Sequence, residues 1–295
     1  MIGLILLVLQ LSAGACAGVP ADHVATVEAQ AERDLDAAID AARDMRARAP
    51  DCATAHLAYA IAINRRLQEA KGLKALELSR DYRAALERTL ELEPQDLRAR
   101  MEYIEFFIYA PSIAGGSADR ARREIVTLSR THPLEAARLS VEVESRNGGE
   151  IAQLAALERW ADLAPHDIEA VLRAVLRLAA LERYQDAEQR LLVLAESSDP
   201  HAALASAYWR GRIRVLGRFD LDEAPRLIGA YIEGGGVDRF PQLLPSSARA
   251  LYRLGEAYEL NDRCEDAARY YAQATALDPT IGGLSEASER ARACG

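Results

Sequence analysis

The hydrophobic positions of this chain are most regular near the C-terminus, between Ala248 and Pro279. Apolar and aromatic residues recur there at intervals of three and four, which places them on one face of an α-helix. The pattern restarts at Cys264, so the stretch predicts two helices joined by a short turn. Pro279 ends the second helix because proline lacks the N–H group that a continuing helix needs.

Eight positions of this stretch form a recognisable signature. They are Leu251, Leu254, Gly255 and Tyr258 on the first helix, Ala267, Tyr271 and Ala274 on the second, and Pro279 at the end. Gly255 and Ala267 are expected where the helices cross, because small side chains allow a close approach. The spacing resembles that of the tetratricopeptide-repeat family, whose unit is a helical pair of 34 residues. The resemblance implies a right-handed superhelix whose first helices line a concave groove for a peptide or partner protein.

A similar interval recurs through the rest of the chain. Four further prolines are predicted to close helical pairs, and they are Pro94, Pro133, Pro165 and Pro200. They lie 39, 32 and 35 residues apart, intervals that bracket the 34-residue repeat. The resemblance weakens toward the N-terminus, since Val175 stands in place of the glycine and the linkers over 51–165 are irregular.

The whole pattern predicts an all-α protein, an α-solenoid of antiparallel helical pairs. One long helix is expected over 22–48, about six pairs over 51–280 and a capping helix over 284–293, together a single repeat domain over 22–295. Hydrophobic residues make up 50% of the 295 residues, and the chain is rich in Ala, Leu, Arg and Glu, which favour helices. No window alternates with a period of two, the pattern of a strand.

The N-terminus has the pattern of a secretory signal over residues 1–17. Met1–Leu11 is apolar apart from Gly3 and Gln10, and small residues follow. The run is shorter than the about 20 residues that a transmembrane helix needs, although a membrane-buried helix is the alternative. Cleavage before Cys16 fits an ordinary Ala-x-Ala site. It also fits a bacterial lipoprotein with Cys16 acylated, although Ala13 stands where such signals usually have Leu. A periplasmic or envelope location is expected, with membrane attachment only through that lipid.

Export favours disulfides, because they persist in oxidising compartments. Cys264 begins the second helix of the last pair, and the capping helix must return antiparallel to it. This brings Cys294 beside Cys264, so we predict a Cys264–Cys294 disulfide. Cys52 has no evident partner and is expected to be a buried thiol, and the cysteine spacing does not suggest zinc.

The resemblance also indicates which residues line the groove. In the last pair they are Arg249, Tyr252 and Glu256, and in the preceding pair Tyr208 and Arg212. Tyr103 and Phe107 are expected to contribute from the aromatic helix over 96–109. Tyrosine and arginine are enriched at binding hot spots. The alternative is that each tyrosine packs between repeats.

No group of residues predicts catalysis, a metal or a cofactor. His132, His166 and His201 are 34 and 35 residues apart, so a solenoid separates them by about 10 Å and they share no ion. Gly115-Gly116-Ser117 lacks the lysine of a phosphate-binding loop and is expected to be a turn followed by a helix N-cap. The net charge of −9 argues against a nucleic-acid partner.

Two functions remain open at this point. The first is a non-enzymatic scaffold of the bacterial envelope that binds a protein or peptide partner in the groove. The second is an accessory or ligand-binding subunit of an envelope transporter or enzyme complex. The second function requires a closed small-molecule pocket behind the aromatic helix over 96–109.

Overall fold

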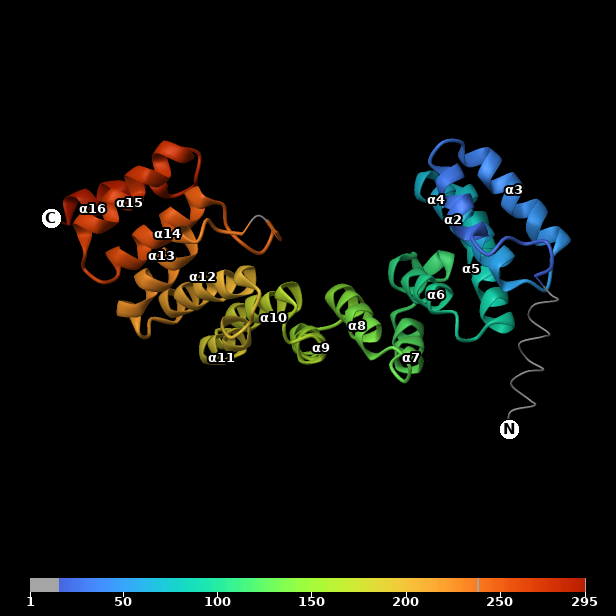
Figure 1. Cartoon of the computed structure of the whole chain (residues 1–295), viewed down its shortest axis with the longest axis horizontal. Coiled ribbons are helices and arrows are strands. Elements are labelled where there is room, and N and C mark those ends of the chain that lie inside the picture. Colours follow the sequence, from blue (N-terminus) through green and yellow to red (C-terminus); the bar gives the residue numbers. More distant parts are fainter. Residues whose placement is uncertain (1–15, 238, 295) are drawn as a thin grey trace. The chain divides into compact units, whose positions relative to one another are not determined.

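The computed structural model describes residues 16–237 and 239–294, and within these ranges it contains helices, turns and no strand. The predicted all-α class is therefore confirmed. The chain divides into two compact units, Met1–Gly148 and Gly149–Gly295 (Figure 1), which we call unit 1 and unit 2. The sequence predicts one continuous array over 22–295, whereas the boundary between the units falls between Pro133 and Pro165, inside one of the predicted helical pairs.

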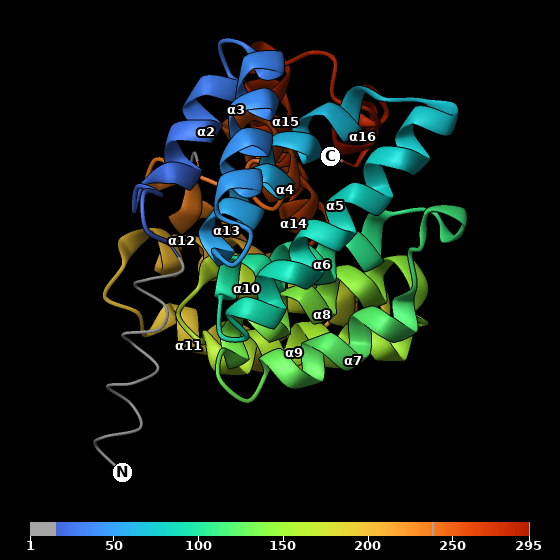
Figure 2. The same ribbon diagram turned by 90° about the vertical axis from the view of Figure 1, so that its right-hand side faces the viewer.

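Unit 1 is a stack of α-helices in which neighbours in sequence pack together. Its helices are α2 (His23–Ala31), α3 (Leu35–Arg48), α4 (Ala53–Glu69), α5 (Gly72–Leu92), α6 (Leu97–Tyr109), the short 3-10 helix η1 (Ser112–Ala114), α7 (Ala118–Leu128) and α8 (Pro133–Asn147). Helix α4 packs against α2, α3 and α5 and is buried along most of its length. The view in Figure 2 shows that the α4–α5 turn and the α6–α7 connection project on the same side of this unit.

Unit 2 continues with helical pairs and ends in a single capping helix. Its helices are α9 (Glu150–Leu163), α10 (Ile168–Ala180), α11 (Tyr184–Ala195), α12 (Pro200–Gly217), the 3-10 helix η2 (Leu221–Glu223), α13 (Ala224–Glu233), α14 (Ser247–Glu259), α15 (Cys264–Leu277) and α16 (Leu284–Ala293). Helix α16 packs on α14 and α15 through Leu284, Ala287 and Ala291. None of the described helices of either unit is long and apolar enough to cross a membrane.

The long N-terminal helix expected over 22–48 is instead two helices, α2 and α3. The break occurs at Asp34, whose carboxylate accepts a hydrogen bond of 3.0 Å from the backbone N–H of Ala37 and caps α3. Aspartate competes for backbone donors in this way and so favours a helix start over a helix interior. The break lets α2 fold back onto α4 and bury Val27 and His23.

The pair α14–α15 has the close approach that the sequence predicts. A Cβ atom added to Gly255 would lie 2.5 Å from Cε1 of Tyr271, which is completely buried. The pair α12–α13 has the same arrangement, since a Cβ on Gly211 would lie 2.6 Å from Cγ1 of Ile228. Both glycines are therefore required by the contact between the two helices of a pair rather than by backbone conformation.

The described residues of the glycine-rich segment over 234–246, which are 234–237 and 239–246, are bonded to two aromatic side chains. Trp209 Nε1 donates a 2.9 Å hydrogen bond to the carbonyl of Leu243. The Tyr231 hydroxyl donates to the carbonyl of Pro245 at 2.9 Å and accepts from the backbone N–H of Val237 at 3.2 Å. The buried Tyr231 thus connects both ends of the segment to α13.

The structure places the four cysteines in two pairs. Cys264 and Cys294 form a disulfide between α15 and the end of α16, with a Cα–Cα distance of 5.9 Å. Cys16 and Cys52 form the other, with a Cα–Cα distance of 4.7 Å. The buried free thiol expected at Cys52 is therefore wrong, because the chain before α2 folds back with Val19 against the α3–α4 turn. A lipidated Cys16 would have no sulfur available for this bond. Residues 1–15 of the predicted signal lie outside the described residues.

Tyr231→Phe should reduce the free energy of unfolding by about 1–3 kcal/mol, because it leaves a buried N–H and a partly buried carbonyl without their shared partner. Denaturant unfolding of the intact chain measures this loss. Tyr184→Phe is the matched control, since no hydrogen bond joins the Tyr184 hydroxyl to another described residue. An equal effect of both substitutions would show that the hydroxyl bridge contributes nothing.

Protein secreted through an oxidising compartment should carry both disulfides. Peptide mapping by mass spectrometry without reduction should find Cys264 linked to Cys294 and Cys16 linked to Cys52. Closing loops of 30 and 36 residues should stabilise each region by roughly 3–4 kcal/mol in the chain-entropy model. Free thiols at Cys264 and Cys294 would contradict the first bond, and an acyl group on Cys16 would contradict the second.

Candidate functional site

The aromatic residues predicted for the groove of unit 1 are buried. Tyr103 and Phe107 lie in the core with ring centroids 4.7 Å apart. The Tyr103 hydroxyl donates to Glu87 on α5 at 2.9 Å and accepts from Arg120 on α7 at the same distance. Burial and the Glu87 carboxylate raise the pKa of Tyr103 to about 12. These two residues therefore join α6 to α5 and α7 and do not line a groove, which corrects the predicted register.

Four of the five groove residues predicted in unit 2 are largely occupied by contacts within the unit. Tyr208 and Tyr252 are less than a tenth exposed, and their rings lie 5.1 Å from Tyr231 and 5.7 Å from Tyr271. Arg212 is also buried and forms a 2.9 Å ion pair with Glu256 between α12 and α14. Burial lowers the pKa of Arg212.

Glu256 also forms a 2.7 Å ion pair with Arg253, so its carboxylate already has two cationic partners. Arg249 is exposed and lines a cleft of about 420 Å³ beside the segment over 234–246. Of the predicted residues, it is the one that is exposed, whereas Glu256 is only partly exposed.

A larger cleft of about 630 Å³ lies in unit 1 between α4, α5, α6 and the α6–α7 connection. Its walls are mostly apolar, and α4, α5 and α6 each contribute polar side chains. The lining residues are Asn64, Leu67, Gln68, Ala70, Gly72, Ala75, Leu76, Ser79, Tyr82, Glu102, Glu105, Phe106, Tyr109, Ala110, Pro111 and Ala114. Helices α4 and α6 are the first helices of successive pairs, to which the resemblance assigns the groove, but the second helix α5 also forms a large part of the wall.

Three polar residues on one face of α6 line this cleft. Glu102, Glu105 and Tyr109 are three and four residues apart, a spacing that aligns them on a helix. Glu102 accepts a short hydrogen bond from the Tyr82 hydroxyl and a 3.4 Å one from the Asn64 amide. The Tyr109 hydroxyl donates to Glu142 of α8 at 3.1 Å. Tyr103 and Phe107 belong to the opposite, buried face of the same helix.

Glu105 lies in an environment that disfavours its charge. Partial burial, followed by the negative charges of Glu102 and Glu142, raises the pKa of its carboxyl group above the ordinary value of 4.5. No hydrogen bond or ion pair joins the Glu105 carboxylate to another residue of the described ranges. The cleft therefore has a partly desolvated acidic group without a cation.

Two apolar side chains that are adjacent in sequence to lining residues of the cleft face water, and we call them its rim. Leu73 follows the lining residue Gly72, Ile113 precedes the lining residue Ala114, and both side chains are 80% exposed. The connection that carries Ile113 needs its glycines, since a Cβ on Gly116 would lie 1.7 Å from the carbonyl oxygen of Ala110. Ser117 then caps α7, so Gly115-Gly116-Ser117 is the turn and N-cap that the sequence predicts.

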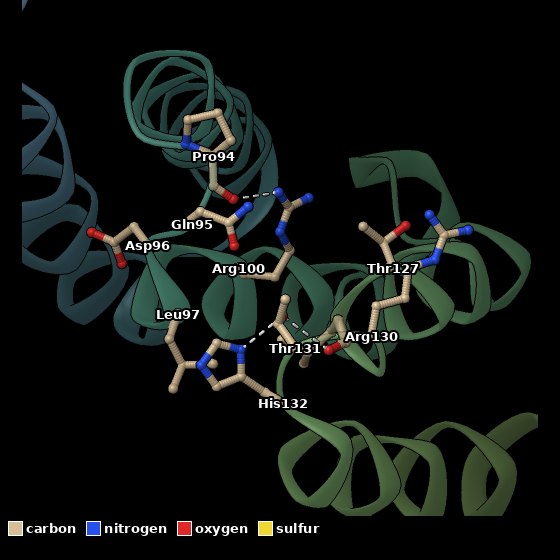
Figure 3. A pocket seen from close by; sticks show the side chains of 10 residues that line it. Pro94, Gln95, Asp96, Leu97, Arg100, Thr127, Arg130, Thr131 and His132 are labelled. Carbon is tan, nitrogen blue, oxygen red and sulfur yellow. Dashed lines mark hydrogen bonds between the residues drawn. The ribbon is translucent and has the colours of Figure 1, made fainter. Parts of the chain in front are cut away.

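A second hollow of unit 1, about 300 Å³ in volume, lies where the α5–α6 turn meets the end of α7. Figure 3 shows that its polar side chains do not converge. Arg100 donates to the carbonyl of Pro94 at 2.9 Å and pairs with Glu124, whereas Arg130 extends away from His132. His132 Nδ1 lies 2.9 Å from the hydroxyl oxygen of Thr131. This arrangement offers no common binding point for an anion.

The three regularly spaced histidines lie at the beginnings of helices or in turns. His132 precedes α8, His166 lies in the α9–α10 turn, and His201 is in the first turn of α12. Within residues 16–237 and 239–294, no group of three or more His, Cys, Asp or Glu residues has the arrangement of a metal site.

The sequence does not predict that the polar residues of α6 line a cleft. The two predicted aromatic residues of the same helix are the stronger candidates for binding by residue type, but they lie on its buried face. The sequence contains one signal, since Glu102 and Glu105 interrupt the apolar run that follows Arg100 at helical spacing. Leu73 and Ile113 carry no such signal, because a hydrophobic residue in an irregular linker is as readily read as part of the core.

Comparison with known proteins identifies the fold. No family model matches the sequence, and no curated protein matches it. The C-terminal part of a TPR repeat-containing protein from Cytophaga hutchinsonii is similar in structure, with a TM-score of 0.63 and 13% identity over 90% of this chain and 98% of that one. The chain thus has the fold of the tetratricopeptide-repeat proteins.

Two assemblies are less similar. The structure of Naa15/Naa10 bound to HypK-THB has a TM-score of 0.48 at 13% identity, over 92% of this chain and 39% of that one. The APC/C hetero-tetramer Cut9–Hcn1 has a TM-score of 0.46 at 15% identity, over 91% of this chain and 48% of that one. The present chain spans less than half the length of either.

Glu105→Gln should raise the free energy of unfolding at pH 7. Because the pKa of Glu105 is raised on folding, the folded state binds its proton more tightly, and the ionised form is destabilising at neutral pH. The difference from the parent should shrink as the pH falls and vanish below 4.5, where both states are protonated. Denaturant unfolding at pH 7 and pH 4 measures it, with the exposed Glu77→Gln as control. A difference that is the same at both pH values would contradict the explanation.

Proposed function

We propose that this chain is a non-enzymatic interaction scaffold that binds an extended segment of a partner protein in the cleft of unit 1. The observation that carries the proposal is the cleft of about 630 Å³ with two exposed apolar side chains at its rim. Exposed apolar groups beside a concave surface are typical of protein interaction sites. The tetratricopeptide-repeat fold supports the same function, because its helical pairs present surfaces rather than catalytic groups.

The same cleft is a poorer match to the second function, a small-molecule pocket. A pocket for a small ligand buries most of the ligand surface. Here Leu73 and Ile113 are 80% exposed, and Tyr109, which lines the cleft, is 48% exposed. An open rim of this kind can contact a chain that continues past the cleft on both sides, which favours a peptide segment.

We further place this function in the bacterial cell envelope. The apolar run and small residues over 1–17 support export. Two disulfides support an oxidising compartment, because such bonds rarely persist in the cytosol. With Cys16 in one of them, we favour cleavage at the Ala-x-Ala site over lipid attachment.

Selection of random dodecamer peptides displayed on phage against the intact chain tests the binding function. Selected peptides should bind the Leu73→Ser and Ile113→Ser variants at least about tenfold more weakly, a loss of 1.4 kcal/mol that is typical of hot-spot side chains. Ile151→Ser is the matched control, because Ile151 is 85% exposed but lies in unit 2. Peptides that bind both rim variants as tightly as the parent would exclude this cleft as their site.

A further inference from the structure

The acidic residues of unit 1 outside the cleft are widely paired with arginine. The pairs are Glu28–Arg98, Glu124–Arg100 at 2.8 Å, Glu144–Arg122 at 2.8 Å, Glu87–Arg120 at 3.6 Å and Asp51–Arg88 at 2.8 Å. In the cleft the pattern ends, since within the described residues neither Glu102 nor Glu105 has an Arg, Lys or His at ion-pair distance. Arg98, one turn earlier on α6, interacts with Glu102 electrostatically but forms its ion pair with Glu28. The cleft therefore differs from the surrounding surface in having two carboxylates without a direct ion pair.

The existing contacts of Glu102 leave its charge in place. The Tyr82 hydroxyl and the Asn64 amide are neutral donors, so they satisfy lone pairs of the carboxylate without neutralising it. Glu105 lies one helical turn further along α6 and has no donor among the described residues. Both carboxylates face a space whose walls include Leu67, Leu76 and Phe106.

This combination of groups is complementary to a long cationic side chain. The aliphatic stem of a lysine or arginine packs along apolar walls while its charged end reaches a polar group. Two carboxylates in a mostly apolar cleft meet both requirements. The attraction is stronger in a partly desolvated site than at an open surface, where screening by water and salt is greater.

We propose that the bound segment inserts a lysine or arginine side chain between Glu102 and Glu105 and places an adjacent apolar residue against Leu73 and Ile113. This proposal rests on the proposed function and adds the chemistry of the partner. The site does not depend on its acidic residues alone, because the exposed rim is an independent apolar contact. Acidic segments are excluded by repulsion, which gives the cleft selectivity as well as affinity.

Two dodecamer libraries test the proposal, one random and one random except that it lacks Lys and Arg. Peptides from the complete library should contain Lys or Arg, and their affinity should fall at least about tenfold when that residue is replaced by Gln. Glu105→Gln should weaken the same peptides about tenfold and should leave rim contacts intact. Glu77→Gln, on the solvent face of α5, is the matched control and should change the affinity less than about twofold.

The outcomes separate this proposal from the proposed function. If the library without Lys and Arg gives equally tight binders that still depend on Leu73 and Ile113, the cationic partner is wrong and peptide binding in the cleft stands. The same conclusion follows if Glu105→Gln, shown to be folded by circular dichroism, binds cationic peptides unchanged. If neither library gives binders that depend on the rim, the proposed function itself fails.

Discussion

The close contact between the two helices of a pair is the constraint on which the rest of this fold depends. In α14–α15 and α12–α13 the contact is so close that a single methyl group on Gly255 or Gly211 would overlap a buried side chain. Each pair presents its remaining faces to the neighbouring pairs or to solvent, so the core grows along the chain instead of around a centre. The first helix of a pair can therefore contact a partner only through the face that this packing leaves exposed.

Helix α6 illustrates the division of faces. Its aromatic side meets α5 and α7, where Tyr103 and Phe107 fill the core and the Tyr103 hydroxyl joins charged groups of both neighbours. Its other side is left with Glu102 and Glu105, which no neighbouring helix supplies with a cation. The cleft follows from this arrangement, because the α4–α5 turn and the α6–α7 connection leave space above that face.

The sequence predicted the elements that depend on local spacing and missed those that depend on distant neighbours. The helical pairs, the Gly255 contact and the return of α16 toward Cys264 follow from periodicity and small residues, which are local properties. The prediction that Tyr103 and Phe107 line a groove was wrong, because the spacing of apolar and polar residues does not indicate which neighbouring helix a given face of α6 contacts. The Cys16–Cys52 bond was missed for a related reason. It requires that the chain before α2 folds back on the α3–α4 turn, which spacing alone does not indicate.

The uncompensated charge of the cleft links binding to stability. An ionised carboxylate in a partly desolvated position is unfavourable for the free protein, as the raised pKa of Glu105 indicates. A pairing arginine on α4 or α5 would remove that cost, and arginine occupies such positions around Glu28, Glu124 and Glu144. Its absence here leaves the carboxylate available to a cation from outside the chain. The ionised Glu105 carboxylate therefore lowers the stability of unit 1 when the cleft is empty and attracts a cation when the cleft is filled. This is an example of the general opposition between stability and function.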